Sequence, residues 1–197
     1  MQSFTQIIIA FGYVGIAIAI FAESGFLLGF FLPGDSLVFA VGILASRGYF
    51  NIWILVIIAM VAAILGDSFG YSFGRYFGPR VFSKEDSKLF KKEYVNRTEN
   101  FYHKYGSKTI ILARFVPIIR TFAPVMAGVG KMEYKRFLAN NVVGGVLWAG
   151  GVLLLSYFLG SRFKAIDKYF LWIVIIIILI SVVPIIIDFL KKSPSKN

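Results

Sequence analysis

Residues 114–121 read RFVPIIRT and place two arginines and a proline inside an otherwise apolar segment, residues 109–130. Proline has no backbone N–H and its ring clashes with the preceding turn, so Pro117 predicts that a helix is interrupted there. Pro124 follows in the same segment and predicts a further interruption. The segment is therefore expected to form short, broken helices and not one continuous helix.

The composition of the chain indicates a lipid environment. Of its 197 residues, 58% are hydrophobic and 16% are charged, whereas a soluble domain has about 45–50% apolar and about 25% charged residues. The chain has no cysteine, which excludes disulfides, a thiolate nucleophile and Cys-ligated metal sites. A single histidine excludes His-rich metal sites, and no cofactor is expected.

Three other apolar segments are long enough to cross a bilayer, which requires about 20 residues in a helix. Full spans are predicted at residues 51–78, 134–160 and 169–190. The polar connector at residues 81–106 is predicted to be cytoplasmic. Its aromatic residues recur near helical spacing, so it is either an amphipathic helix on the membrane surface or a solvated loop.

A second interrupted segment covers residues 7–45. It contains Leu-Pro-Gly-Asp at residues 32–35, in which Pro33 and Gly34 predict a break. Broken backbone at membrane depth is tolerated only where protein or a polar cavity surrounds it. We therefore expect residues 7–45 and 109–130 to be re-entrant helical hairpins, with two full crossings as the alternative for the first.

The chain also repeats weakly at a distance of 82 positions, which aligns Gly78 with Gly160. Each copy, residues 1–80 and residues 107–162, is then a hairpin followed by one long helix. An odd number of crossings in each copy makes the two copies inverted. The predicted fold is an all-α integral membrane protein, with a single membrane domain at residues 1–197, two inverted repeats and an additional C-terminal transmembrane helix.

The basic residues concentrate on one side of this arrangement. Residues 80–108, residues 131–136 and the C-terminal tail hold 14 lysines and arginines, against 4 in the loops of the other side. The positive-inside rule then predicts an external N-terminus and a cytoplasmic C-terminus. The bias would shrink if every apolar segment crossed. Basic loops beside anionic lipid also make nucleic acid an unexpected partner.

Four charged residues fall within the two predicted hairpins, namely Glu23, Asp35, Arg114 and Arg120. One charge at the centre of a membrane costs about 2.5–3.5 kcal/mol on insertion scales, so these groups must face one another or a polar cavity. They are interpreted either as ion pairs that hold the hairpins together or as a functional site, and both interpretations can apply to different states. The two arginines meet only if the helix breaks between them.

The residue types suit one kind of chemistry. An arginine presents a planar fork of donors that matches phosphate oxygens and keeps its charge at any relevant pH. A partly desolvated carboxylate can bind a proton near neutral pH. Arginines that hold an anion, beside acids that exchange protons, predict a proton-coupled carrier of an anion or a phospholipid.

Packing is predicted for another set of residues. Glycines at every fourth position let two membrane helices approach closely, and such glycines are found at Gly66, Gly70, Gly74 and Gly78. Trp148 is also interpreted as a packing residue.

A polar stripe on the same predicted helix carries Asp67, Tyr71 and Arg75 at helical spacing. We expect Tyr71 to bridge the two charges, with a share in a translocation pathway as the alternative. Asn140 and Asn141, in the next long helix, are expected to form hydrogen bonds across helices and to be candidates for the same pathway.

Four blocks in this order resemble the signatures of the DedA family of SNARE-associated, or VTT-domain, membrane proteins. The blocks are FAESG at 21–25 with FLPGDS at 31–36; GD, GY and GRYFG at 66–67, 70–71 and 74–78; RFVPIIRT at 114–121 with Pro124 and AG at 127–128; and Asn140 or Asn141 with Gly144 and Trp148. The resemblance covers residues 12–160.

The resemblance implies two facing re-entrant hairpins in a bacterial inner membrane, dependence on the proton motive force and, in bacterial members, flipping of the carrier lipid undecaprenyl phosphate. It also implies that the essential acids are Glu23 and Asp35 and that the essential arginines are Arg114 and Arg120. The leading hypothesis is therefore a lipid flippase, with Arg114 and Arg120 binding the phosphate and the two acids coupling protons.

Three other hypotheses are kept. The first is a proton-coupled carrier of a small ion or solute, in which the arginines are structural. The second is an enzyme acting on lipid phosphates, which is disfavoured because no cysteine and only one histidine are present. The third is a structural membrane protein, and in any of these cases the chain can form a homo-oligomer.

Overall fold

The computed structural model describes residues 2–26, 34–81 and 106–162 of the chain. All regular structure in these residues is helical. The elements are α1 Gln2–Gly25, α2 Gly34–Ser46, α3 Ile52–Val81, α5 Thr109–Ala113, α6 Pro117–Val129, α7 Tyr134–Gly145, the π-helical turn η2 Val146–Gly150 and α8 Gly151–Arg162. The predicted span at residues 169–190 and most of the predicted connector at residues 81–106 lie outside the described residues.

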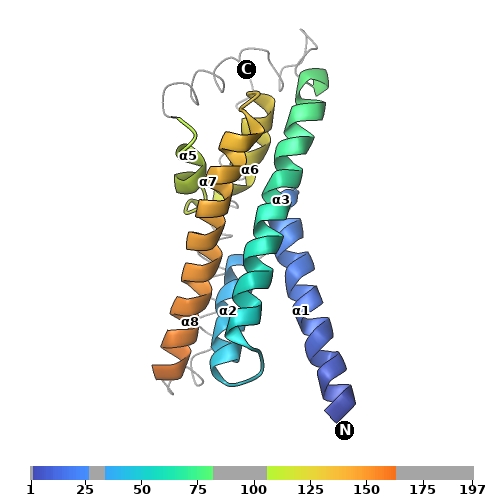
Figure 1. Cartoon of the computed structure of the whole chain (residues 1–197), viewed down its shortest axis with the longest axis vertical. Coiled ribbons are helices and arrows are strands. Elements are labelled where there is room, and N and C mark those ends of the chain that lie inside the picture. The colour runs from blue at the N-terminus through green and yellow to red at the C-terminus, as the bar shows by residue number, and fades with distance from the viewer. Residues whose placement is uncertain (1, 27–33, 82–105, 163–197) are drawn as a thin grey trace, which may run out of the picture.

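Two long apolar helices form the axis of the molecule. One is α3, and the other is the continuous run of α7, η2 and α8; they lie antiparallel in Figure 1. Their apolar portions, Ile52–Gly78 and Tyr134–Arg162, are 27 and 29 residues long. At 1.5 Å per residue each is about 40 Å long, enough to cross a bilayer. These helices match the spans predicted at residues 51–78 and 134–160.

The start of α3 is determined by Asn51. Its Oδ1 accepts hydrogen bonds from the backbone N–H of Trp53 at 2.9 Å and of Ile54 at 3.4 Å, as a side-chain N-cap does. The backbone N–H of Asn51 donates to the hydroxyl of Tyr13 at 2.7 Å. Tyr13 belongs to α1, so this bond ties the first helix to the start of α3.

The remaining helices pack at opposite ends of this axis. In Figure 1, α2 lies beside the lower half of α3, and α6 lies beside its upper half. Both α2 and α6 have 13 residues, which corresponds to about 20 Å and is shorter than the hydrocarbon core of a bilayer. By contrast α1 has 24 residues, or about 36 Å, so the first arm of the predicted hairpin is longer than half a membrane.

The interruption predicted by RFVPIIRT is present. Helix α5 ends at Ala113 and α6 begins at Pro117. Val116 has an extended backbone, with φ −112° and ψ 110°, as expected for a residue that precedes proline.

The break predicted at Pro124 is wrong, because Pro124 lies inside the continuous helix α6. Neighbouring helices can compensate for a proline inside a membrane helix. Pro124 is buried, and it faces Gly70 of α3, where an added Cβ would lie 3.6 Å from the proline Cβ. Gly70 thus leaves space for the proline ring against α3, and α6 continues through Pro124. For the break predicted at Pro33 and Gly34, Gly34 is the first residue of α2, and Pro33 lies outside the described residues.

Apolar side chains form two separate clusters. The lower cluster joins α1, α2, α3 and α8 and includes Ile20, Leu55 and Leu153. The upper cluster joins α3, α5, α6 and α7 and includes Ala127 and Phe137. Buried charged and polar side chains lie between the two clusters.

The four-residue glycine ladder packs as predicted. A Cβ at Gly66 would lie 2.7 Å from the carbonyl oxygen of Phe21 on α1, and one at Gly74 would overlap the carbonyl of Val125 on α6. A Cβ at Gly78 would lie 2.8 Å from a methyl group of Val129 on α6. Small residues therefore let α1 and α6 lie directly against α3.

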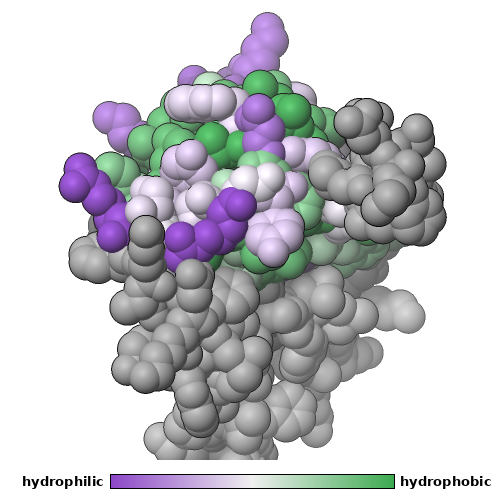
Figure 2. Space-filling model, turned by 90° about the horizontal axis from the view of Figure 1, so that it is seen from below, coloured by the Kyte–Doolittle hydropathy of each residue, from purple (hydrophilic) through white to green (hydrophobic). Residues whose placement is uncertain are grey.

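The outer surface of α3 is apolar over most of its length. Exposed hydrophobic residues recur at Trp53, Ile57, Val61, Leu65, Phe69 and Phe73. Figure 2 looks onto the lower end of the molecule, where hydrophilic residues stand among hydrophobic ones. An apolar flank with polar residues at its end suits a protein surrounded by lipid.

Candidate functional site

Four buried charged residues meet between the two apolar clusters. They are Glu23 near the end of α1, Asp67 in the middle of α3, Arg114 directly after α5 and Arg120 in the first turns of α6, and each is at most 8% exposed. Because the chain breaks between Ala113 and Pro117, both arginines can turn into the same layer of the structure.

Arg114 is held by partners from two long helices. Its Nη2 forms an ion pair with Asp67 of α3. The same nitrogen donates to Oδ1 of Asn141 on α7 at 2.9 Å and to the carbonyl oxygen of Ala63 at 3.3 Å. Asn141 in turn donates its Nδ2 to the carbonyl oxygen of Ile64 at 3.0 Å. The prediction that a buried asparagine bonds across helices is confirmed at this residue.

Two glycines of α7 make room for the Arg114 side chain. A Cβ at Gly145 would lie 2.5 Å from its Nη1, and a Cβ at Gly144 would lie 3.3 Å from its Cδ. Nη1 is buried and has no hydrogen-bond partner among the described residues. Buried guanidinium nitrogens normally donate hydrogen bonds to a partner. Nη1 of Arg114 can therefore donate to an additional group, such as a ligand.

Arg120 lies between an acid and an aromatic ring. Its Nη2 is 3.4 Å from Oε1 of Glu23, which is longer than the usual 2.7–2.9 Å of a charge-assisted hydrogen bond. Its Cζ lies 4.1 Å from the centroid of the Trp148 ring, in cation–π geometry. The guanidinium is thus supported on one face while its edge points towards a carboxylate.

The two ion pairs belong to one cluster. Besides its contact with Arg114, Asp67 also experiences the charge of Arg120. The cluster contains two arginines and two acids, so the charges of these four residues balance. Mutual pairing offsets the cost of placing charges in an apolar interior. The expectation that ion pairs hold the two hairpins together is therefore met for Glu23 with Arg120, whereas Arg114 pairs with Asp67 of α3.

Trp148 packs as predicted and also contacts a residue of the charged cluster, which the sequence did not indicate. It belongs to the lower apolar cluster, as a packing residue would, and it also contacts Arg120. It lies in η2, the π-helical turn, and such turns occur often at functional sites. A usable signal was present, because Asn141, Gly144, Gly145 and Trp148 lie at helical spacing and share one face of the helix.

The three residues of the predicted polar stripe on α3, Asp67, Tyr71 and Arg75, have different surroundings. Tyr71 does not bridge Asp67 and Arg75, because its hydroxyl donates to the carbonyl oxygen of Met132 and its ring stacks on Phe137 at 4.6 Å. Arg75 is exposed. The stripe fails as a ladder because Asp67 faces the charged cluster, whereas Tyr71 faces the upper apolar cluster.

Asn140, another candidate, forms its hydrogen bonds away from the four charged residues. Asn140 donates its Nδ2 to the hydroxyl of Ser107 at 3.0 Å and to the carbonyl of Arg136 at 2.8 Å. It therefore joins α7 to the start of the α5 segment. The backbone of Asp35 is in the first turn of α2, and its side chain lies outside the described residues.

Comparison with known proteins gives one consistent result. Residues 32–158 match the VTT domain family. The chain is 44% identical to protein DedA of Escherichia coli K12 over 183 residues, which are 92% of this chain and 83% of that protein.

Mycobacterial proteins are also similar. An uncharacterized membrane protein of Mycobacterium tuberculosis H37Rv is 47% identical over 176 residues, covering 88% of this chain and 77% of the relative. One of Mycobacterium leprae is 46% identical over 144 residues, covering 73% and 64%. No solved structure matches the chain.

Proposed function

Because the chain belongs to the DedA, or VTT-domain, family of membrane proteins, we propose that it moves a phosphate-headed lipid across the membrane. The substrate class is a polyprenyl phosphate such as undecaprenyl phosphate, or another phospholipid, and the movement is coupled to protons. The observation that carries the proposal is the pair of buried guanidinium groups of Arg114 and Arg120. Arg114 directly follows α5, and Arg120 lies in the first turns of α6, after the break.

The two arginines receive different roles. Arg114 has Asp67, Asn141 and Ala63 around one nitrogen, which suits a fixed anchor whose Nη1 remains available to a phosphate oxygen. Arg120 faces Glu23 at 3.4 Å. When Glu23 takes up a proton it loses its charge, and a lipid phosphate can replace it beside Arg120.

Coupling then follows from charge balance. With Glu23 ionised, the charges of Glu23, Asp67, Arg114 and Arg120 cancel, which weakens the attraction for an anion. Protonation of Glu23 makes the charge of the site more positive by one, and an anionic phosphate compensates for this change. Asp35 at the start of α2 is assigned as a second proton-coupling acid on the basis of its place in the family signature.

The proposed membrane arrangement uses the short helices. We assign α1 with α2, and α5 with α6, as hairpins that enter from opposite leaflets and form inverted repeats with α3 and with α7–α8. On the basis of the loop charges and the positive-inside rule, we assign the N-terminus to the outside and the C-terminus to the cytoplasm of an inner membrane.

Reconstitution tests the transport proposal. The protein is placed in liposomes that contain undecaprenyl phosphate, and exposure of the lipid phosphate on each leaflet is measured with and without a pH gradient. Wild-type protein should equalise the leaflets without a pH gradient and enrich the lipid in one leaflet with a gradient. Arg120→Lys should be slow in both conditions because lysine lacks the planar fork. Arg136→Lys is the matched control, since Arg136 is exposed and its ion-pair partner Glu133, at 3.1 Å, is three residues away in the chain. Wild-type rates for Arg120→Lys would contradict the assigned role.

The second candidate is a proton-coupled carrier of a small ion or solute. It is favoured by the ion pairs that Arg114 and Arg120 form with Asp67 and Glu23, because these pairs can be purely structural. The buried acid Glu23 can then exchange a proton without any lipid. Solute-driven proton flux in liposomes that lack polyprenyl phosphate would select this candidate over the first.

A further inference from the structure

The second long helix contains a π-helical turn near its centre. Helix α7 ends at Gly145, η2 covers Val146–Gly150, and α8 begins at Gly151. The backbone is α-helical on both sides of the turn, with φ −63° and ψ −44° at Gly145 and φ −61° and ψ −49° at Gly151. Each hydrogen-bonded turn of a π-helix spans one residue more than a turn of an α-helix. The helix therefore changes its register at η2 without ending.

The two halves of this helix pack against different parts of the molecule. Helix α7 lies against α5, where a Cβ at Gly144 would lie 3.4 Å from the Cα of Ile111. Helix α8 lies against α2, where a Cβ at Gly42 would overlap the side chain of Ser156. In the proposed membrane arrangement α2 and α5 belong to different hairpins. The π-helical turn is therefore located at the junction between the part that carries one hairpin and the part that carries the other.

Two glycines at the end of η2 have no packing reason among the described residues. A Cβ at Gly150 or at Gly151 would have no atom of a neighbouring element within 4 Å, whereas a Cβ at Gly145 would lie 2.5 Å from the guanidinium of Arg114. Glycine destabilises a helix relative to alanine, because it loses more backbone freedom when the helix forms. Glycine at these two positions thus lowers helix stability and makes a change of backbone conformation easier.

The same turn carries a residue that contacts the charged cluster. Trp148 lies in η2, is buried in the lower apolar cluster, and has its ring centroid 4.1 Å from Cζ of Arg120. A rotation of the backbone at η2 moves this ring relative to the guanidinium. Because the ring supports one face of Arg120, such a rotation changes how firmly the arginine is placed towards an anion.

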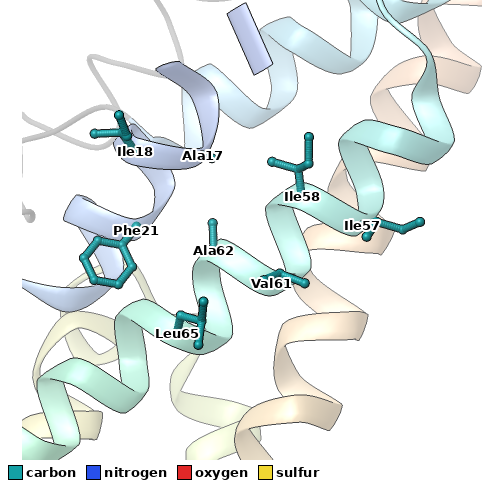
Figure 3. Close-up of a pocket in the computed structure, with 8 residues that line it drawn as sticks. All are labelled: Ala17, Ile18, Phe21, Ile57, Ile58, Val61, Ala62 and Leu65. Atoms are coloured by element: carbon teal, nitrogen blue, oxygen red, sulfur yellow. The ribbon is translucent and has the colours of Figure 1, made fainter. Parts of the chain in front are cut away.

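The first long helix differs from the second in this respect. Helix α3 is α-helical from Ile52 to Val81. It contacts α1 at Gly66 and also borders an apolar groove against α1, and in Figure 3 the lining residues from Ile57 to Leu65 project from one continuous ribbon. We therefore expect α1 and α3 to stay together while the second long helix twists at η2.

We propose that η2 is a hinge of the transport cycle. It lets α8, together with α2, turn relative to α7 and α5, and this turn moves Trp148 towards Arg120 or away from it. Arg120 holds the lipid phosphate while the ring of Trp148 supports it and releases the phosphate when the ring moves away. The inference rests on the proposed function, because the cycle is that of the phosphate-headed lipid.

Distances across the hinge test this inference in lipid nanodiscs. The natural chain has no cysteine, so spin labels can be attached through Ala139→Cys on α7 and Phe158→Cys on α8, two exposed positions. At 1.5 Å per residue they are separated by about 28 Å along the helix axis, within the range of electron paramagnetic resonance distance measurements. Addition of short-chain phosphatidic acid should shift the distance distribution, because binding of the phosphate favours one state of the hinge.

Alanine at the two glycines should stiffen the hinge. The double variant Gly150→Ala/Gly151→Ala adds methyl groups to open space and favours a regular α-helix. Its thermal midpoint should equal or exceed that of the wild type, whereas phosphatidic acid should no longer shift the distance distribution. Movement of undecaprenyl phosphate in liposomes should be several-fold slower. Gly15→Ala is the matched control, because a Cβ at Gly15 of α1 also has no atom within 4 Å, and it should change neither distances nor movement.

A distance distribution that phosphatidic acid leaves unchanged in the wild-type background would overturn the inference. A lower thermal midpoint of the double variant would also overturn it, because the two glycines would then be packing sites. Wild-type rates of lipid movement in the double variant would have the same consequence. A shift in distance without lipid movement by the wild-type protein would support the hinge and contradict the transport proposal, and lipid movement without a shift would do the reverse.

Discussion

At the scale of the residue, the two arginines of one sequence motif have different surroundings. Arg114 is fixed by Asp67, Asn141 and the carbonyl of Ala63, whereas Arg120 lies between Glu23 and the face of Trp148. A buried ion pair contributes little net stability, but removing one partner leaves an unpaired buried charge. The two arginines should therefore respond differently to substitution.

The pair Asp67–Arg114 should behave as one structural unit. Removing either charge, as in Asp67→Asn or Arg114→Gln, should lower the free energy of unfolding by about 3–5 kcal/mol. The double variant should lose much less than the sum of the two, because no unpaired charge remains. Unfolding titrations of the four proteins in mixed micelles measure this coupling, and additive losses would contradict it.

Trp148 should position Arg120. Trp148→Leu removes the ring below the guanidinium, and a desolvated cation–π contact contributes about 2 kcal/mol. We expect weaker binding of a short-chain phosphatidic acid to the detergent-solubilised protein in a calorimetric titration, with partial recovery in Trp148→Phe. Trp53→Leu is the matched control, because Trp53 is 65% exposed and distant in sequence from the cluster. Equal losses at both tryptophans would argue against this role.

At the scale of the element, one helix organises the molecule through its glycine face. Helix α3 carries Gly66 against α1, Gly70 against both α1 and α6, and Gly74 and Gly78 against α6. Van der Waals packing of small residues is a main driving force for helix association in lipid. The same contacts carry Asp67 into the middle of the structure and hold α6 close to it.

Substitution of Gly74 should therefore disturb the packing of α6. In Gly74→Ala the new methyl group overlaps the backbone of Val125, and overpacking of this kind costs about 1–3 kcal/mol. Gly15→Ala is the control, because no atom lies within 4 Å of a Cβ built at Gly15. Thermal denaturation should show a lower midpoint for Gly74→Ala and an unchanged or slightly higher one for Gly15→Ala. A matching midpoint for both would refute the packing role of Gly74.

At the scale of the whole molecule, the ends of the broken segment lie on one side. Ser107, before α5, accepts a hydrogen bond from Asn140 on α7 at 3.0 Å. Helix α7 begins at Tyr134, only a few residues after α6 ends at Val129. Both ends of residues 109–130 are thus near the same end of α7, as the proposed hairpin requires.

Single-cysteine labelling can test this topology in intact cells, since the natural chain has no cysteine. Lys108→Cys and Lys131→Cys should react with a membrane-impermeant maleimide from the same side, and Tyr49→Cys should react from the opposite side. All three positions are exposed. Labelling of Lys108→Cys and Lys131→Cys from opposite sides would show that the segment crosses the membrane.

The elements of the fold were largely predictable from the sequence because they depend on local properties. The length and hydropathy of residues 52–78 and 134–162 indicated two long membrane helices, and Pro117 indicated the break between α5 and α6 because it lacks a backbone donor. Pro124 carries the same local signal, yet α6 continues through it. Its packing against Gly70 depends on a helix more than 50 positions away, which no local rule describes.

The sequence by itself determined that Glu23, Asp35, Arg114 and Arg120 lie in apolar segments and must face one another or a polar cavity, because an isolated charge there is too costly. Only the tertiary structure decided the pairing of Arg114 with Asp67 and Asn141, the stacking of Arg120 on Trp148 and the groove between α1 and α3. Each of these depends on which helices touch and at what separation. That choice is made by close packing among residues far apart in the chain, and helical periodicity does not specify it.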